Sequence, residues 1–296
     1  MNSYTCAVSE KEIQKIKTDL GEKGFEFKDL PYGFFQAFHK TLAVNLSLYH
    51  SKKCVVQGKG TEDFVRFYLE PEILKTFALD YAHLEYEEKI GMDESGKGDF
   101  FGPLAVASVF LPKACFNEFK EAGVMDNKKI HDKKILILDA MIQKKLPCKT
   151  IVVGPEKYNT LYERFRNLNI MLAWAHAAAL RDLSSVCSAK KALLDQFAAP
   201  YLVESKLEKM GVSITLEQKT HAESDLAVAC ASIVARASFL KGLKTLSEKF
   251  SMEFPKGAGA PVNKTAKNFV NQFGREALKS VAKIHFRNAT PFMNTH

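Results

Sequence analysis

The sequence predicts an α/β protein with a small α+β domain at its N-terminus, and three observations support this prediction. From residue 89 onward, short apolar runs typical of strands alternate with longer segments whose apolar residues recur at helical spacing. Residues 1–68 begin with an amphipathic segment and continue with short strand-like runs. Residues 69–88 are acidic and interrupted by Pro71, and we interpret them as a linker. A length of 296 residues suits one or two domains.

Capping and periodicity predict the N-terminal elements. Residues 9–20 favour a helix, because Ser9 can cap it, Glu12 stands at the capping-box position and apolar residues recur at helical spacing. Apolar and polar residues alternate over 44–49, as they do in a half-buried strand. The expected strands are 34–38, 43–49 and 53–57, and a helix with Thr61 as its N-cap is expected over 61–68.

The C-terminal part is expected to alternate between strands and helices. Residues 89–92 and 103–111 favour two strands joined by a short glycine-rich connection, so we expect antiparallel neighbours. Pro155 begins a helix at the first-turn position that proline tolerates. The other expected elements are helices over 130–144, 169–183 and 222–241, strands over 150–154, 192–194 and 212–218, and a helical tail over 261–281.

Charge and cysteine content narrow the class of protein. The formal net charge is +8, yet residues 1–88 hold 11 Lys and Arg against 14 Asp and Glu, so the basic excess lies in residues 89–296. Such a part is typical of a protein that binds a polyanion, although a merely soluble basic surface has the same composition. The six cysteines lack a C-x-x-C spacing, which argues against a zinc site or a disulfide framework. Without an apolar signal region or a run of about 18 apolar residues, we expect a soluble, cytoplasmic protein.

Residues 31–61 contain no Asp or Glu. Four lysines lie there among five Phe and Tyr residues. A small antiparallel sheet with one basic, partly aromatic face would serve as a platform for nucleic acid. The alternative is that the aromatic side chains form the core of the sheet and the lysines only solvate its surface.

The stretch 91–103 carries the strongest chemical signal. Asp93 and Glu94 end the first strand of the α/β part, and Gly96-Lys97-Gly98 follows them. Two carboxylates at a strand end favour a hard cation. A glycine-flanked lysine offers backbone N–H groups and a positive charge to a phosphate. The stretch therefore predicts a cation site beside a phosphate-binding loop.

Two further acids lie at the ends of expected elements. Asp195 closes the strand 192–194, and Glu223 opens a helix that is apolar nearly all round and therefore buried. Together with Asp93 and Glu94 they would hold two Mg²⁺ ions for in-line displacement at phosphorus. A lone acid at a strand end or a helix start also occurs in structural roles, and Asp225 is an alternative to Glu223.

Residues 91–104 (GMDESGKGDFFGPL) closely resemble the signature of the type 2 ribonuclease H family, and Gly-Lys-Gly instead of Gly-Arg-Gly is similar to its bacterial ribonuclease HIII branch. Further motifs follow in the family's order and extend the resemblance over residues 90–265. They are 126–130, 167–176, 195–197, 222–224 with 227–236, and 256–259.

The resemblance implies a fold and an activity. Residues 85–296 would form a ribonuclease H-like mixed sheet flanked by helices, and residues 1–84 a substrate-binding domain similar to half of the TATA-box-binding protein. The implied activity is that of an endonuclease that hydrolyses the RNA strand of RNA/DNA hybrids, leaving 5′-phosphate and 3′-hydroxyl ends. The implied cofactors are two ions of Mg²⁺ or Mn²⁺. We expect a monomer that binds the hybrid duplex and no membrane.

The resemblance also implies roles for individual residues. The metal-binding catalytic acids would be Asp93, Glu94, Asp195 and Glu223. Gly96-Lys97-Gly98 would read the 2′-hydroxyl, which distinguishes RNA from DNA at one nucleotide, and hold the flanking phosphate. The other expected substrate-binding residues are Ser95, Lys128 and Asn169.

Two positions depart from the family's pattern. Asn127 stands where Ser is usual, and His221 stands where Lys commonly precedes the fourth acid. His221 would weaken a phosphate contact or make it pH-dependent. His176, in the apolar helix, is interpreted as a core residue.

Two other functions are compatible with the same residues. A hybrid-binding protein without catalysis is one, and the intact set of four acids argues against it. Another two-metal nuclease of this fold, such as a junction resolvase, is the second, and Gly96-Lys97-Gly98 argues for recognition of RNA instead.

Overall fold

The computed structural model describes residues 3–74, 87–124, 130–220 and 222–293, without the side chain of residue 223. The chain divides into two compact units, Met1–His83 and Leu84–His296, and each is described here by itself.

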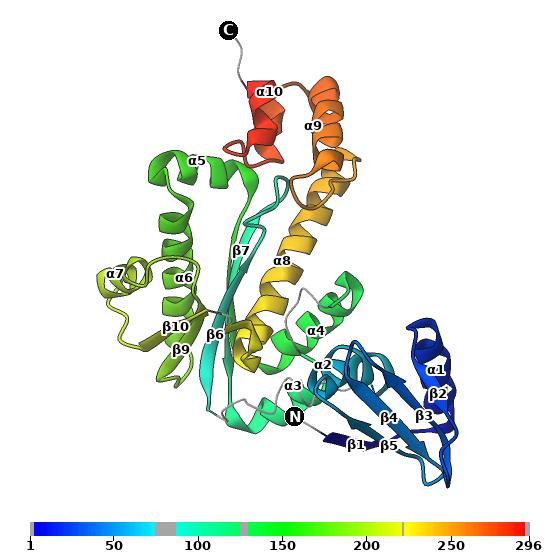
Figure 1. Ribbon diagram of the computed structural model, residues 1–296. Helices are drawn as coiled ribbons and strands as arrows, with labels where there is room; N and C mark the ends of the chain where they lie inside the picture. The colour runs from blue at the N-terminus through cyan, green and yellow to red at the C-terminus, as the bar shows by residue number, and fades with distance from the viewer. Residues whose placement is uncertain (1–2, 75–86, 125–129, 221, 294–296) are drawn as a thin grey trace. The chain divides into compact units, whose positions relative to one another are not determined.

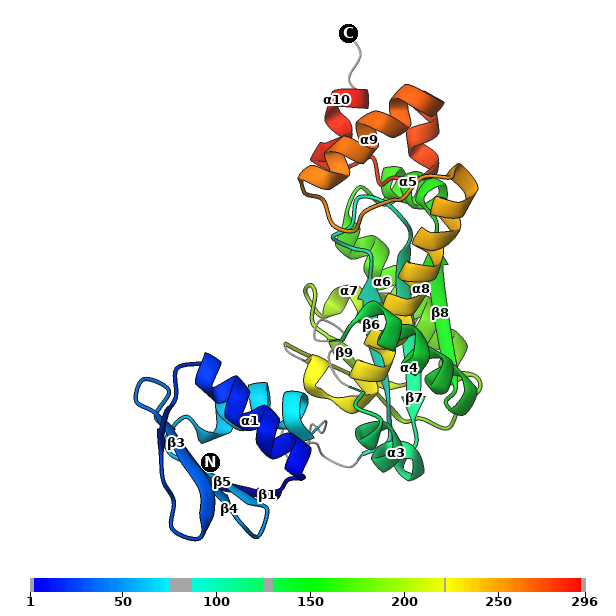
Figure 2. The ribbon, with the colours of Figure 1, turned by 90° about the vertical axis from the view of Figure 1, so that its right-hand side faces the viewer.

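The N-terminal unit is a five-stranded antiparallel sheet with helices on one face (Figure 1, Figure 2). The strand order is β1-β5-β4-β3-β2. Alternate residues of β4 such as Leu46 and Leu48 are fully buried in a core shared with α1 and α2. The elements are β1 (Ser3–Ala7), α1 (Glu10–Glu22), β2 (Glu26–Lys28), β3 (Gly33–His39), β4 (Val44–Tyr49), β5 (Lys53–Gln57), α2 (Thr61–Phe64) and the π-helical segment η1 (Val65–Leu74).

Helix α1 confirms the predicted capping box. The Ser9 side chain accepts from the Glu12 backbone N–H, and the Glu12 carboxylate accepts from the Ser9 N–H at 2.6 Å. The expected strands are also present, with β1 and β2 added at the two edges. β1 and β2 escaped prediction because edge strands of three to five residues carry little periodic signal.

The end of this unit differs from the prediction in two ways. Gly60, and not Thr61, is the N-cap of α2. The helical segment then continues through Pro71 to Leu74 as η1, so the residues interpreted as the start of a linker are helical. Leu69 and Ile73 are buried in the unit's core, and this packing outweighs the proline. The rest of the predicted linker, 75–86, lies outside the described residues.

The C-terminal unit is built on a five-stranded mixed sheet of order β10-β9-β6-β7-β8. β6–β7 and β7–β8 pair antiparallel, as the glycine-rich connection predicted for the first pair, whereas β6–β9 and β9–β10 pair parallel. The strands are β6 (Lys89–Ser95), β7 (Leu104–Leu111), β8 (Cys148–Val153), β9 (Lys191–Asp195) and β10 (Thr215–Lys219).

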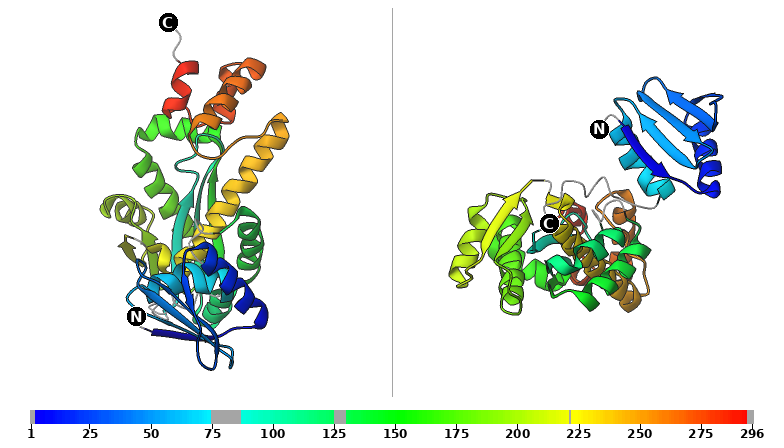
Figure 3. Two further views of the ribbon diagram at one scale, coloured as in Figure 1. Left: turned by 45° about the vertical axis from the view of Figure 1, so that its right-hand side comes forward. Right: turned by 90° about the horizontal axis from the view of Figure 1, so that it is seen from below.

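Helices cover both faces of this sheet, with α6 and α8 on opposite sides (Figure 1, Figure 3). Gly91 of β6 faces α8, where a Cβ atom would lie 2.0 Å from the Ala227 carbonyl carbon, so only glycine permits this approach. Met92 faces the other way and packs in one cluster with residues of α6. The helices are α3 (Phe116–Glu121), α4 (Asp132–Lys145), α5 (Pro155–Phe165), α6 (Leu168–Ser184), α7 (Tyr201–Lys209), α8 (Leu226–Phe250), α9 (Ala260–Phe273) and α10 (Thr290–Met293), with short 3₁₀ turns η2 (Lys113–Cys115), η4 (Ala222–Ser224), η5 (Glu276–Ser280) and η6 (Arg287–Ala289).

Helix α8 is long and apolar enough to cross a membrane by length and composition, but 72% of that apolar window is buried inside the protein. It packs along β6, β7 and α4. This burial is that of a core helix.

The expected helical tail is divided into α9 and η5. Gly274 separates them with a φ of +85°, a conformation that favours glycine. Around α9, Phe254 and Phe269 are buried in an aromatic cluster with the end of α8. The helix α7 was not predicted, although it is partly buried.

Candidate active site

Asp93 of β6 and Asp195 of β9 come directly after the last residues through which these two parallel strands pair with each other. Met92 of β6 pairs with Leu194 of β9, so the acid after each occupies the same edge of the sheet. On its other side Asp93 pairs with Ala107 of β7. The parallel register thus brings together two predicted acids that lie about 100 positions apart in the chain.

Glu94 points to the opposite face of the sheet from Asp93. Its Oε2 lies 3.1 Å from Nε2 of His176 in α6, and its Oε1 lies 3.4 Å from Nζ of Lys97. The Glu94 side chain is only 10% exposed. Burial by itself raises the pKa of Glu94, but the hydrogen bond and charge of His176, together with Lys97, outweigh it and hold the pKa below its ordinary value.

The pKa of Asp93 is shifted in the opposite direction to that of Glu94. Burial, then the neighbouring charges of Glu94 and Asp195, raises the pKa of Asp93 to about 7, against the lowering effect of hydrogen bonds from Ser232 and from the Glu94 backbone. The Glu94 N–H donates to Asp93 Oδ1 at 2.7 Å. A carboxyl group in this state is one that a bound cation would stabilise as the anion.

Asp195 connects the sheet to the segment that holds Glu223. Its Oδ1 accepts from the Ala222 backbone N–H at 3.1 Å. Ala222 begins the turn η4, so the backbone of Glu223 follows immediately, whereas its side chain is not described. The sequence predicted one helix from 222, but α8 begins only at Leu226, because Asp225 caps it.

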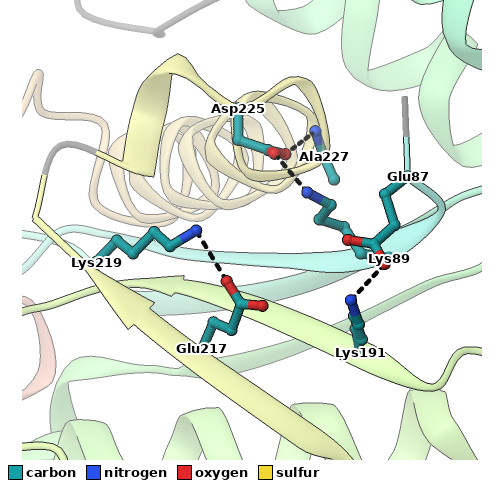
Figure 4. A network of polar contacts seen from close by, with 7 residues as sticks. All are labelled: Glu87, Lys89, Lys191, Glu217, Lys219, Asp225 and Ala227. Atoms are coloured by element: carbon teal, nitrogen blue, oxygen red, sulfur yellow. Dashed lines mark hydrogen bonds and ion pairs between the residues drawn. The ribbon is translucent and has the colours of Figure 1, made fainter. Parts of the chain in front are cut away.

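Asp225, the alternative to Glu223, makes structural contacts (Figure 4). Its Oδ1 accepts from the Ala227 N–H at 2.9 Å as the helix cap, and its Oδ2 lies 3.0 Å from Nζ of Lys89. Both carboxylate oxygens of Asp225 are therefore engaged in structural contacts. On β10, Glu217 and Lys219 form an ion pair at 2.8 Å. Figure 4 marks this pair with a dashed line.

The Gly96-Lys97-Gly98 loop has a tightly fixed start and an exposed middle. Gly96 has a φ of +88°, and a Cβ atom there would lie 2.2 Å from the Pro103 carbonyl oxygen. Ser95, before it, is buried. The Lys97 side chain is 41% exposed, and its Nζ lies 5.7 Å from the ring centroid of Phe197. The loop therefore presents a cation and backbone beside Glu94.

The remaining predicted substrate residues are not brought to the acids by any contact among the described side chains. Asn169 is half-buried in the first turn of α6, where its N–H donates to the cap Asn167 at 2.8 Å. Lys128, Asn127 and His221 lie outside the described residues.

His176 belongs to the candidate site, which the sequence pattern did not predict. Its ring is fully buried, as expected of a core residue, but it contacts Glu94 and stacks on Phe197 with centroids 5.3 Å apart. Within the described residues its Nδ1 has no hydrogen-bond partner. The signal was available, because an imidazole in an otherwise apolar helix requires a polar partner.

The donor set suits a hard divalent cation. Carboxylate oxygens from Asp93, Glu94 and Asp195 are the ligand type that Mg²⁺ and Mn²⁺ prefer. Among the side chains that the structure describes, no group of three or more His, Cys, Asp or Glu converges closely enough to hold a metal by itself. The raised pKa of Asp93 nevertheless fits a cation at this edge.

Comparisons with known proteins agree with this geometry. The model of the ribonuclease HII family matches residues 90–289, and that of a domain of unknown function matches residues 4–79. Ribonuclease HIII of Chlamydia pneumoniae is 42% identical over 275 residues, 92% of each chain.

Two solved structures resemble nearly the whole chain. Bst ribonuclease HIII, crystallised with Mn²⁺, covers 97% of both chains with a TM-score of 0.67 and 26% identity. Ribonuclease H3 of Aquifex aeolicus covers 96% of this chain and 100% of its own, with a TM-score of 0.58 and 27% identity. The expected mixed α/β fold with a TATA-box-binding-protein-like N-terminal unit is confirmed. The chain belongs to the ribonuclease HII family, on its ribonuclease HIII branch, and is a ribonuclease H enzyme.

Proposed function

We propose that this protein is an endonuclease that hydrolyses the RNA strand of RNA/DNA hybrids with two divalent metal ions and leaves 5′-phosphate and 3′-hydroxyl ends. The observation that carries the proposal is the meeting of Asp93 and Asp195 at one sheet edge, where burial and then the neighbouring carboxylates raise the pKa of Asp93. Relatives named ribonuclease HIII support the substrate class.

Four acids would hold the ions, namely Asp93, Glu94, Asp195 and Glu223. Ions bound there would activate water for the attack on phosphorus and would stabilise the leaving 3′-oxygen. The protein's part is to orient the oxygens. The Ala222 N–H fixes one oxygen of Asp195, the Glu94 N–H fixes one oxygen of Asp93, and His176 holds Glu94.

We assign recognition of the sugar and phosphate to the loop of Ser95 and Gly96-Lys97-Gly98. The exposed Gly98 lets a substrate backbone approach closely, since no described atom beyond the adjacent residues lies within 4 Å of the position of its missing Cβ. The Lys97 ammonium lies beside Glu94 and is accessible to a phosphate. N–H groups and a 2′-hydroxyl can then hydrogen-bond at this one nucleotide. Lys128 and Asn169 remain proposed substrate contacts.

The N-terminal unit, which we propose spans residues 1–84, would bind the hybrid through the sheet face that its helices leave open. Phe35 is buried in the core, whereas the adjacent Phe34 is 44% exposed. On the open face Lys28 Nζ lies 4.8 Å from the ring centroid of Phe38. The face therefore combines exposed aromatic and basic side chains, a combination that binds nucleic acid. We further propose that the protein acts as a monomer in the cytoplasm, away from membranes.

One assay tests the activity. A hybrid labelled on the RNA strand is incubated with Mg²⁺, with Mn²⁺ and with EDTA, beside a DNA duplex, single-stranded RNA and a four-way DNA junction. We expect cleavage of the hybrid alone, dependent on metal, with products that a ligase requiring 5′-phosphate and 3′-hydroxyl ends accepts. Binding without cleavage in either metal would identify a binding protein, and cleavage of the junction alone a resolvase.

A further inference from the structure

Lys283 is fully buried behind the Gly96-Lys97-Gly98 loop. Its Nζ donates to the carbonyl oxygens of Asp99 at 2.8 Å and Gly102 at 2.7 Å, and lies 3.5 Å from that of Phe101. An ammonium has three N–H donors, which matches these three acceptors. Burial lowers the pKa of Lys283 to about 7 despite the charge of Asp99, so these acceptors offset only part of the cost of desolvating the ammonium.

The backbones of the two segments are joined as well. The Lys283 N–H donates to the Phe100 carbonyl at 2.9 Å, and the Gly102 N–H donates to the Val281 carbonyl at 3.0 Å. Phe101 and Ala282 form a β-bridge between these two bonds. The C-terminal segment is thus paired with the turn 99–102 through both its backbone and the Lys283 side chain.

Asn159 of α5 holds the C-terminal segment from the other side. Its Nδ2 donates to the carbonyls of Lys279 at 3.1 Å and Ala282 at 2.9 Å, and its Oδ1 accepts from the Ile284 N–H at 3.0 Å. Asn159 is itself buried. Lys283 therefore reaches the turn from a fixed base.

The turn 99–102, which Lys283 contacts, directly follows the Gly96-Lys97-Gly98 loop and leads into β7. Gly96 at the start and Gly102 at the end both have positive φ, +88° and +82°, and both lie against the ring of Phe239. Between them, Asp99 Oδ1 accepts from the Gly257 N–H at 2.6 Å. A shift of the turn would therefore be transmitted to Lys97 and Gly98, whose backbone groups make no hydrogen bond among the described contacts, although the Lys97 side chain contacts Glu94 and Phe197.

We propose that Lys283 is a positioning residue for ribonucleotide recognition: its side chain holds the carbonyls of the turn 99–102 and thereby fixes Gly96-Lys97-Gly98 for reading the sugar. The effect on recognition rests on the proposed function, whereas the effect on the turn does not.

The test compares Lys283→Met with Phe269→Leu. The first removes all three donors at similar length, and the second loosens the aromatic cluster of the same C-terminal region without removing a donor to the turn. Affinities for an RNA/DNA hybrid and for a DNA duplex of the same sequence are measured in EDTA, and both variants are studied below their unfolding transitions. In Lys283→Met we expect the preference for the hybrid to fall roughly tenfold, the effect of about 1.4 kcal/mol of lost hydrogen bonding. Phe269→Leu should keep it. Equal preference in both variants would overturn the recognition role.

A second measurement covers the case in which Lys283→Met does not fold. Lys283→Gln keeps two N–H donors without the charge and should give an intermediate preference. In the unmodified protein, hydrogen exchange followed by NMR should show the amides of Gly102 and Lys283 exchanging at matched rates, because one opening event exposes both. Fast exchange at Gly102 with a protected Lys283 amide would contradict the coupling. A wild-type protein that shows no preference for the hybrid would refute the proposed function. Whether the side chain holds the turn is then decided by the Gly102 amide, which should exchange faster in Lys283→Gln than in the wild type if it does and at the same rate if it does not.

Discussion

His176 of α6 and Glu94 of β6 lie 3.1 Å apart, Nε2 to Oε2, in a site where the imidazole is fully buried. Glu94 leaves the sheet on the α6 side, whereas Asp93 leaves it toward Ser232 of α8. A histidine that is hydrogen-bonded to a metal-binding carboxylate orients the carboxylate oxygens without touching the substrate. We therefore regard His176 as a positioning residue for Glu94.

Replacing His176 tests this role. We expect His176→Phe, which keeps the stacking on Phe197 but has no ring nitrogen, to lower the cleavage rate about 10- to 100-fold and to raise the Mn²⁺ concentration needed for half-maximal rate. His176→Asn, which retains a donor, should lose less. A titration of the cleavage rate with Mn²⁺ measures both effects. A full rate in His176→Phe at low Mn²⁺ would show that Glu94 needs no such support.

The raised pKa of Asp93 predicts how stability depends on pH. Its value in the folded protein is about 7, against an ordinary 3.8. Stability that is present below pH 3.8 is therefore lost as the pH rises through about 7. In EDTA, Asp93→Asn should be more stable than the wild type at pH 8, by roughly 1–3 kcal/mol, with the gap shrinking toward pH 4.

Urea unfolding of both proteins at several pH values measures this gap. Addition of Mn²⁺ should stabilise the wild type more than Asp93→Asn, because only the wild type has the full set of ligands. A variant that is less stable than the wild type at pH 8 in EDTA would contradict the electrostatic account.

Glu223 and Asp225 are predicted to fail in different ways. Glu223→Gln removes a proposed ligand and should abolish most cleavage with little loss of stability. Asp225→Asn keeps an oxygen that can cap α8 but loses the charge that pairs with Lys89, so it should cost up to about 1 kcal/mol of stability and leave most of the cleavage rate. Single-turnover rates and melting temperatures of the two variants distinguish them. Loss of cleavage in Asp225→Asn alone would exchange their roles.

Deleting residues 1–84 tests the role of the N-terminal unit. If its open sheet face binds the hybrid, the truncated protein should lose affinity by at least about tenfold while its single-turnover rate at saturating substrate stays near that of the full chain. Titrations of hybrid binding, followed by anisotropy at two salt concentrations, measure the loss. Unchanged affinity would contradict the proposal that the open sheet face of the N-terminal unit binds the hybrid.

The proposed catalytic acids were easier to predict from the sequence than the residues that hold them in place. Asp93 and Asp195 were predictable because each follows a short apolar run, and parallel strands of an α/β sheet end at the same edge. The contact of His176 with Glu94 depends on how α6 rotates against β6, which helical periodicity does not specify. Lys283 contacts the turn after this loop but lies about 180 positions later in the sequence, so no local sequence pattern predicts the contact.

Local rules also failed where packing or capping competed with them. Proline is expected to end a helix, yet buried Leu69 and Ile73 carry η1 past Pro71. Apolar periodicity extended the last long helix back to 222, whereas Asp225 caps it and leaves Glu223 in a separate turn. This separation matters, because it places the backbone of Glu223, the proposed fourth acid, on a turn tied to Asp195 and not on the helix.

The most direct test of the central claim compares single-turnover cleavage of a labelled RNA/DNA hybrid by the wild type, Asp93→Asn and Glu217→Gln. Glu217 is a control from the same sheet, because its carboxylate pairs with Lys219, the residue opposite Asp195 on β10, and is not a proposed metal ligand. We predict that Asp93→Asn binds the hybrid normally and cuts it at least about 100-fold more slowly, and that Glu217→Gln cuts at the wild-type rate. Cleavage by Asp93→Asn near the wild-type rate would contradict the assignment of this carboxylate cluster as the catalytic centre.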